Sequence, residues 1–78
     1  MRSTMTFALF DYARLAEPCE GWGAEGDDMV RFEAGEIGAV IQLFPDGAEL
    51  ELLNQEGYTI GFVDVRFDQI EALPPRPS

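Results

Sequence analysis

The sequence contains no histidine and no lysine, which removes imidazole bases, imidazole metal ligands and Schiff-base lysines from consideration. Its single cysteine, Cys19, excludes an internal disulfide and a cysteine metal cluster. Cys19 also stands beside Glu20, whose negative charge disfavours the thiolate that a nucleophile needs. We therefore predict that the chain is not an enzyme and has no catalytic residue, no cofactor and no bound metal.

Long apolar runs are also absent. No run approaches the roughly 20 residues that cross a bilayer. The first residues lack the basic-then-apolar order of a secretion signal. With a single cysteine, the chain also fits a reducing compartment. These features predict a cytoplasmic protein with no membrane partner.

Positive charge is scarce. Five arginines face fifteen aspartate and glutamate residues, so the formal net charge is −10. Such a surface repels nucleic acid and anionic membranes, and it attracts basic protein surfaces. Acidity that only keeps a small protein soluble is the alternative interpretation, and composition alone leaves both open.

What is present is a small, strand-rich domain. The 78 residues are 46% hydrophobic, enough for one core. Aromatic residues in 6–12 predict a first strand. The segment "AELELL" alternates Ala48, Leu50 and Leu52 with two glutamates, as a half-buried strand does. Turn signals at 45–47 and 54–57 divide the chain further, and "DQIEAL" predicts a helical turn or a closing strand.

Residues 17–28, "EPCEGWGAEGDD", combine three glycines and a proline with five carboxylates, which predicts a long acidic loop. "GWGAEG" matches the dinucleotide fingerprint, but no strand–helix unit surrounds it and its acidic neighbours repel phosphate. Two interpretations of Trp22 stand. Either it folds back over Phe10 or Tyr12, or it is an exposed interface anchor.

Glu49 and Glu51 lie two apart on a predicted strand, so they share one face about 6.5–7 Å apart. That spacing is comparable to the spacing of successive phosphates along a nucleic-acid strand. The alternative is an ordinary solvent-facing side of the strand. The candidate partner-binding residues are Glu17, Glu20, Trp22, Glu25, Asp27, Asp28, Glu49 and Glu51.

The first half of the chain resembles a Src-homology-3 (SH3) domain. "ALFDY" is followed by an acidic segment, then by "DDMVRFEAGEIGAVIQ", and the likeness covers about residues 8–42. It implies that Phe32 fills the barrel and that Gly35 forms the diverging turn. The second half lacks the tryptophan, proline and tyrosine of the SH3 peptide groove. The resemblance thus implies the fold: an all-β, five-stranded SH3-like barrel with a long acidic first loop, over 1–73, followed by a flexible proline-rich tail, 74–78.

About two thirds of the chain is also similar to a small SH3-like bacterial domain of unknown function, found near toxin and defence genes. The matching segments are "DYARLAEP", "AGEIGAV" and "AELELLNQEGYTIG", with 19–28 as an insertion. The matching positions are Asp11, Leu15, Gly35, Gly38, Val40, Glu49, Glu51, Gly57 and Thr59.

In size, charge and lack of catalytic groups, the chain resembles small phage-encoded anti-CRISPR proteins that mimic DNA. This resemblance implies an inhibitor, acting in the host cytoplasm if phage-encoded, that blocks the basic nucleic-acid-binding surface of a larger complex such as a CRISPR effector. The chain would not bind nucleic acid directly, and it would be a monomer or weak homo-oligomer. Two alternatives remain: an antitoxin or immunity module that caps a basic toxin site, and an SH3-like adaptor that binds peptides.

Overall fold

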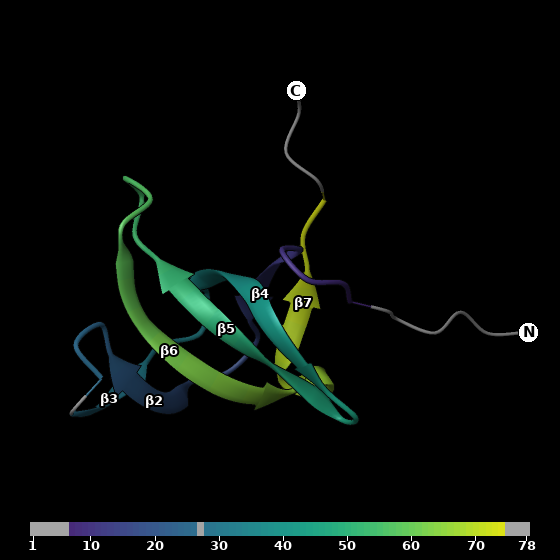
Figure 1. Ribbon diagram of the computed structural model, residues 1–78, viewed down its shortest axis with the longest axis horizontal. Helices are drawn as coiled ribbons and strands as arrows, with labels where there is room; N and C mark the ends of the chain where they lie inside the picture. Colours follow the sequence, from purple (N-terminus) through teal and green to yellow (C-terminus); the bar gives the residue numbers. More distant parts are fainter. Residues whose placement is uncertain (1–6, 27, 75–78) are drawn as a thin grey trace, which may run out of the picture.

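The computed structural model describes residues 7–26 and 28–74. This part of the chain is all-β, as predicted, and its strands form a single antiparallel sheet (Figure 1). The elements are β1 Tyr12–Leu15, β2 Cys19–Gly23, β3 Met29–Phe32, β4 Ile37–Phe44, β5 Gly47–Leu53, β6 Thr59–Arg66, the 3-10 helix η1 Phe67–Gln69, and β7 Ile70–Ala72.

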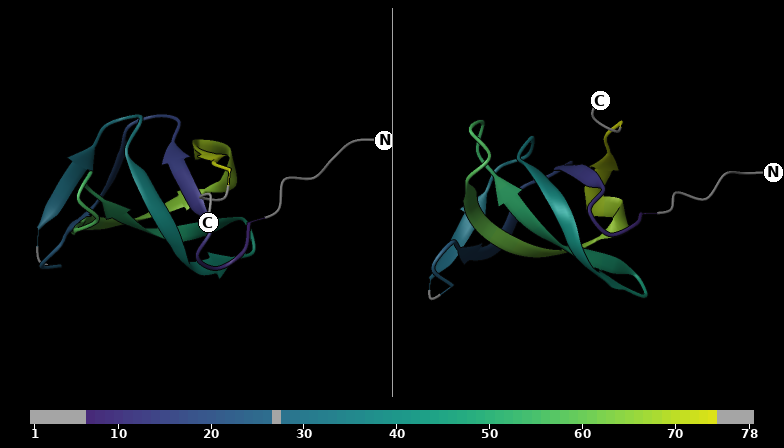
Figure 2. Two further views of the ribbon diagram at one scale, coloured as in Figure 1. Left: turned by 90° about the horizontal axis from the view of Figure 1, so that it is seen from above. Right: turned by 45° about the horizontal axis from the view of Figure 1, so that its top comes forward.

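The seven strands lie in the order β3-β2-β6-β5-β4-β1-β7. The sheet bends strongly, so that the β2–β3 hairpin and strands β1 and β7 rise on the same side of β4, β5 and β6 (Figure 2). Between the described residues, no pairing joins the edge strands β3 and β7, and the sheet is therefore not closed. The sheet has seven strands rather than the predicted five, because Cys19–Gly23 forms the paired strand β2 inside the predicted loop and the short β7 pairs with β1.

The predicted loop over 17–28 is wrong at its centre, where Cys19–Gly23 forms strand β2. Cys19 and Gly21 are buried while Glu20 and Trp22 are exposed, which is the two-residue period of a strand. A Cβ on Gly21 would collide with the carbonyl oxygen of Phe62. Gly21 therefore marks a close approach of two strands rather than a flexible loop.

The first strand begins at Tyr12, so the prediction of a strand over 6–12 is also wrong. Phe7 is buried, and its ring stacks on Phe67 with the centroids 5.5 Å apart. The chain then turns. The Asp11 carboxylate accepts a hydrogen bond from the Ala8 N–H at 2.8 Å, and Phe10 takes a φ of 72°. A short polar side chain that captures a backbone N–H competes with strand pairing, and here it prevails.

The concave side of the sheet holds the core. Val40, Leu50, Leu52 and Val63 are fully buried, which confirms the predicted alternation of residues 48–53. Phe32 is also in this core, as predicted.

The predicted turns at Gly35 and at 54–57 are both present. Gly35 has a φ of 99° at the predicted turn, a conformation that favours glycine. In the turn at 54–57, the Asn54 side chain accepts hydrogen bonds from two backbone N–H groups. The closing segment contains both predicted forms, η1 and then β7. Within the described residues, no helix is long and apolar enough to cross a membrane. Apart from Pro74, the predicted tail lies outside the described residues.

Candidate functional site on the outer face of the sheet

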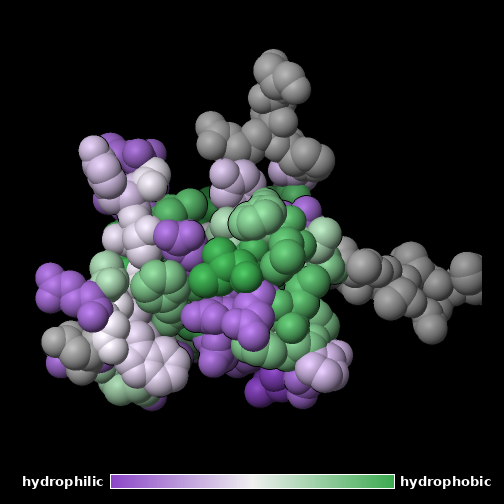
Figure 3. All heavy atoms as spheres, in the orientation of Figure 1, coloured by the Kyte–Doolittle hydropathy of each residue, from purple (hydrophilic) through white to green (hydrophobic). Residues whose placement is uncertain are grey.

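Five side chains share the side of β2, β6 and β5 that faces away from the core. Trp22 is paired with Phe62, Phe62 with Glu51, and Asp64 with Glu49. Directly opposed residues in antiparallel strands point to the same side of a sheet, so these five lie together. We call them the acidic–aromatic face. In Figure 3, hydrophilic side chains gather over β5, between hydrophobic ones over β6 and a broader apolar area over β4.

The face arises from the alternation of strands β5 and β6. In both strands, every second residue enters the core, and the residues between them must point outward. Glu49, Glu51 and Phe62 are half-buried, while Asp64 is exposed. Trp22 keeps 42% of its surface exposed although it lies within a strand. It does not fold back over Phe10 or Tyr12, and its strand neighbours are Phe62 and Met29.

Glu49 and Asp64 form a like-charge pair across neighbouring strands. Their Cα atoms are direct partners in the β5–β6 ladder. Partial burial raises the pKa of the Glu49 carboxyl above its ordinary value, and the negative charge of Asp64 raises it further. Like charges directly opposite each other destabilise a sheet. Fold stability therefore gives no reason for this pair.

Glu51 is held in place by its neighbour on β6. The Thr59 hydroxyl donates a hydrogen bond to Oε2 of Glu51. Within the described residues, no hydrogen bond occupies Oε1. The carboxylate is thus oriented, and in the described part of the chain its other oxygen has no internal donor.

The arginines of the described segments form ion pairs elsewhere. Arg14 binds Glu71 at 2.9 Å, Arg31 binds Glu33 at 3.3 Å, and Arg66 binds Asp68 at 3.0 Å. Among residues 7–26 and 28–74, no ion pair reaches the acidic–aromatic face. Its three carboxylates therefore lack an intramolecular counter-ion in the part of the chain that the structure describes.

The structure brings together only part of the predicted partner-binding set. Trp22, Glu49 and Glu51 lie on the face. Glu20 lies on the same side of β2, but it is paired with Arg31 on β3. The remaining predicted residues are not on the face. Glu25 and Asp28 are in the β2–β3 turn, Asp27 is outside the described residues, and Glu17 is in the bend between β1 and β2.

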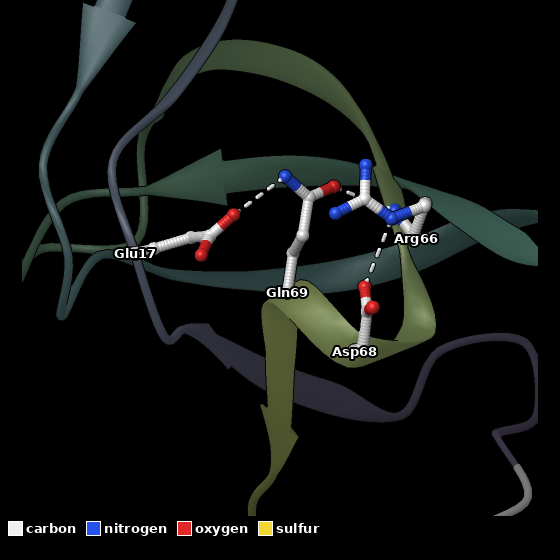
Figure 4. A network of polar contacts seen from close by, with 4 residues as sticks. All are labelled: Glu17, Arg66, Asp68 and Gln69. Atoms are coloured by element: carbon white, nitrogen blue, oxygen red, sulfur yellow. Dashed lines mark hydrogen bonds and ion pairs between the residues drawn. The ribbon is translucent and has the colours of Figure 1, made fainter.

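Glu17 has a structural role (Figure 4). The side-chain N–H of Gln69 donates to Oε2 of Glu17 at 2.9 Å, and the amide oxygen of Gln69 accepts the Arg66 backbone N–H at 2.8 Å. These bonds tie the β1–β2 bend to η1. The carbonyl of Glu17 accepts the Cys19 thiol at 3.4 Å. Burial and the charge of Glu17 raise the pKa of Cys19, while Arg66 opposes this. The thiol is thus kept protonated and weakly nucleophilic.

Sequence reasoning missed Phe62 and Asp64 as members of the site. The signal was available in "YTIGFVDVRF", because residues two apart in a strand share a face. Nothing local indicates that this face adjoins Trp22, however. That contact depends on the pairing of β2 with β6, forty residues apart in sequence.

A second surface feature is an open groove of about 1040 Å³ that adjoins the acidic–aromatic face, since its lining residues Leu53 and Ile60 lie two residues from Glu51 and Phe62 on the same strands. Tyr12 of the "ALFDY" segment lines it, together with Ile37, Leu53 and Leu73. Its lining mixes apolar and polar groups and includes the turns at 34–36 and 54–57. Ile37 is 41% exposed there.

Comparison with protein-family models, with curated proteins and with solved structures finds no match to this chain.

Proposed function

We propose that the protein is a non-enzymatic binding protein whose acidic–aromatic face occupies a basic, nucleic-acid-binding surface of a larger protein or complex. The observation that carries this proposal is the Glu49–Asp64 pair. It is a like-charge contact between paired strands, without an intramolecular counter-ion among the described residues. A cationic partner would neutralise the repulsion between the two carboxylates, so binding would offset the loss of fold stability that the pair causes.

The mechanism follows from charge and contact area. The net charge of −10 steers the chain toward cationic surfaces at long range. At contact, the carboxylates of β5 and β6 pair with arginine or lysine, and Trp22 and Phe62 exclude water. The partner's nucleic acid is then excluded because both ligands compete for one surface. In this respect the protein acts as a DNA mimic of the anti-CRISPR type, working in the cytoplasm as a monomer or weak homo-oligomer.

We further propose that the sheet is an SH3-like barrel with an added arm. Strands β6, β5, β4, β1 and β7 are consecutive in the sheet and supply the five barrel strands. The β2–β3 hairpin would be the arm, packed beside β6. The buried Phe32 and the positive φ of Gly35 support this assignment. The arm matters for function because it carries Trp22 to the acidic strands.

The test is capture of partners from lysate of the host cell, followed by competition. The immobilised chain is expected to retain a nucleic-acid-binding protein that a short DNA duplex displaces and that high salt elutes. The captured protein should in turn lose DNA binding when the chain is added. A partner that neither salt nor DNA displaces would contradict the proposal.

Two alternative functions give different outcomes in the same experiment. Recovery of a toxin whose activity the chain blocks would favour an antitoxin or immunity module. Recovery of proline-rich proteins would favour an SH3-like adaptor, for which the groove beside Tyr12 is the candidate site. A Tyr12→Ala variant would lose only that second kind of partner, whereas a variant of the acidic–aromatic face would retain it.

A further inference from the structure

We infer that the acidic–aromatic face recognises arginine in preference to lysine. The occupant is an arginine side chain of the cationic partner, with its guanidinium over Trp22 and Phe62 and its N–H groups directed to Glu51. This inference rests on the proposed function, because it specifies which cation the same face takes.

The side chains of the face are ordered across the sheet. One row runs Trp22, Phe62, Glu51 over three adjacent strands. Neighbouring strands are about 4.8 Å apart, so Phe62 stands one strand spacing from both an exposed indole and an oriented carboxylate. A planar cation placed over Phe62 meets an aromatic side chain on one side and a carboxylate on the other.

The chemistry of that row suits an arginine side chain. Arginine presents five N–H donors in a plane, stacks on aromatic rings, and is more weakly hydrated than an ammonium group. It therefore combines a cation–π contact with hydrogen bonds to a carboxylate at a small desolvation cost. Glu51 fits this role because Thr59 holds Oε2, while no donor among residues 7–26 and 28–74 reaches Oε1. Lysine supplies a point charge that gains less from the two aromatic side chains.

A pair of acids adjoins the aromatic row. Glu49 and Asp64 lie two residues further along the same two strands. They lie on the same side of the sheet as the aromatic row, and their charge attracts any cation regardless of its shape. The face thus has two parts. The Glu49–Asp64 pair attracts any cation, and the row Trp22, Phe62, Glu51 selects a planar guanidinium. Affinity and preference are therefore separable by mutation.

The experiment uses two fluorescein-labelled peptides of alternating glycine and a basic residue, one with four arginines and one with four lysines. Fluorescence anisotropy at low salt gives the dissociation constant of each peptide for the full chain. We expect the arginine peptide to bind at least about threefold more tightly. Trp22→Leu should abolish this preference, and Trp22→Phe should restore part of it. Tyr58→Leu is the matched control, because Tyr58 is an exposed aromatic residue outside the face, 71% exposed in the turn before β6, and should change nothing.

The outcomes separate the inference from the proposed function. Equal affinities for the two peptides, or a preference that survives in Trp22→Leu, would overturn the arginine inference and leave the charge-based function standing. Loss of affinity for both peptides in Glu49→Gln/Asp64→Asn, with the preference retained, supports both. Absence of binding by either peptide, or binding that this double variant leaves unchanged, would overturn both.

Discussion

The two faces of strands β5 and β6 differ in the chemistry of their side chains. On the inner face, Leu50, Leu52 and Val63 are completely buried within the cluster of apolar core residues. On the outer face, directly across the backbone, Glu49 opposes Asp64 and Glu51 opposes Phe62. The inner face is what the stability of a small domain requires. The outer face places like charges together, which stability does not require. The contrast is what the proposed function expects, because that function places binding rather than folding on the outer face.

The largest effect should come from the inner face. Leu50→Ala is expected to lower the free energy of unfolding by about 2–5 kcal/mol, because it removes transfer energy and leaves a cavity. Leu53→Ala, on the same strand but half-buried on the outer face, should cost clearly less. Urea denaturation of both variants measures the difference. Equal losses would show that the two faces are not energetically distinct.

The second effect tests whether Gly21 is a packing residue of the arm. A Cβ there would meet the backbone of Phe62, so Gly21→Ala should destabilise the fold by about 1–3 kcal/mol through overpacking. Gly23→Ala is the matched control on the same strand, since its Cβ would meet only a Val30 methyl group at 3.6 Å. If both substitutions are tolerated equally in thermal or urea unfolding, β2 does not pack against β6 as described.

A smaller effect of opposite sign is expected on the outer face. Glu49→Gln should raise the free energy of unfolding at neutral pH by about 0.5 kcal/mol, because it removes the repulsion from Asp64. Glu56→Gln, in the exposed turn at 54–57, is the control for loss of one charge and should have no comparable effect.

The same substitution makes a pH prediction. The pKa of Glu49 is raised in the folded protein, so the folded state binds its proton more tightly than the unfolded chain does. The wild-type protein therefore loses stability as pH rises through the range between the unfolded and folded pKa values, just above about 4.3. The advantage of Glu49→Gln should be present at neutral pH and shrink as pH falls through that range. An advantage that is independent of pH would contradict the assigned cause.

The smallest effect concerns Glu17, which belonged to the predicted partner-binding set but lies apart from the face. Glu17→Gln keeps an acceptor for Gln69, so stability should change by less than about 0.5 kcal/mol. Binding of the arginine peptide should be unchanged within a factor of about two, as expected for a screened, distant charge. A loss of peptide affinity as large as that of Glu49→Gln/Asp64→Asn would place Glu17 in the site after all.

The sequence predicted those parts of the fold that depend on local pattern. The alternation of residues 48–53 and the turn at Gly35 needed no knowledge of distant contacts. Strand β2 was missed because its glycines resemble loop residues. Gly21 is in fact a packing residue, because a side chain there would collide with strand β6, which follows forty residues later. For the same reason, the site was predicted only in part. Glu49 and Glu51 share a strand, but their association with Trp22 depends on long-range register.

The proposed function requires that the position of the acids, and not only their number, creates the binding surface. Two double variants with the same net charge test it: Glu49→Gln/Asp64→Asn on the face, and Asp46→Asn/Glu56→Gln in the exposed hairpin turns. Their affinities for the captured partner would be measured by calorimetry at one salt concentration. We predict a loss of at least about tenfold for the first and less than twofold for the second. Equal losses in both would mean that overall charge alone governs binding, and the face would not be a site.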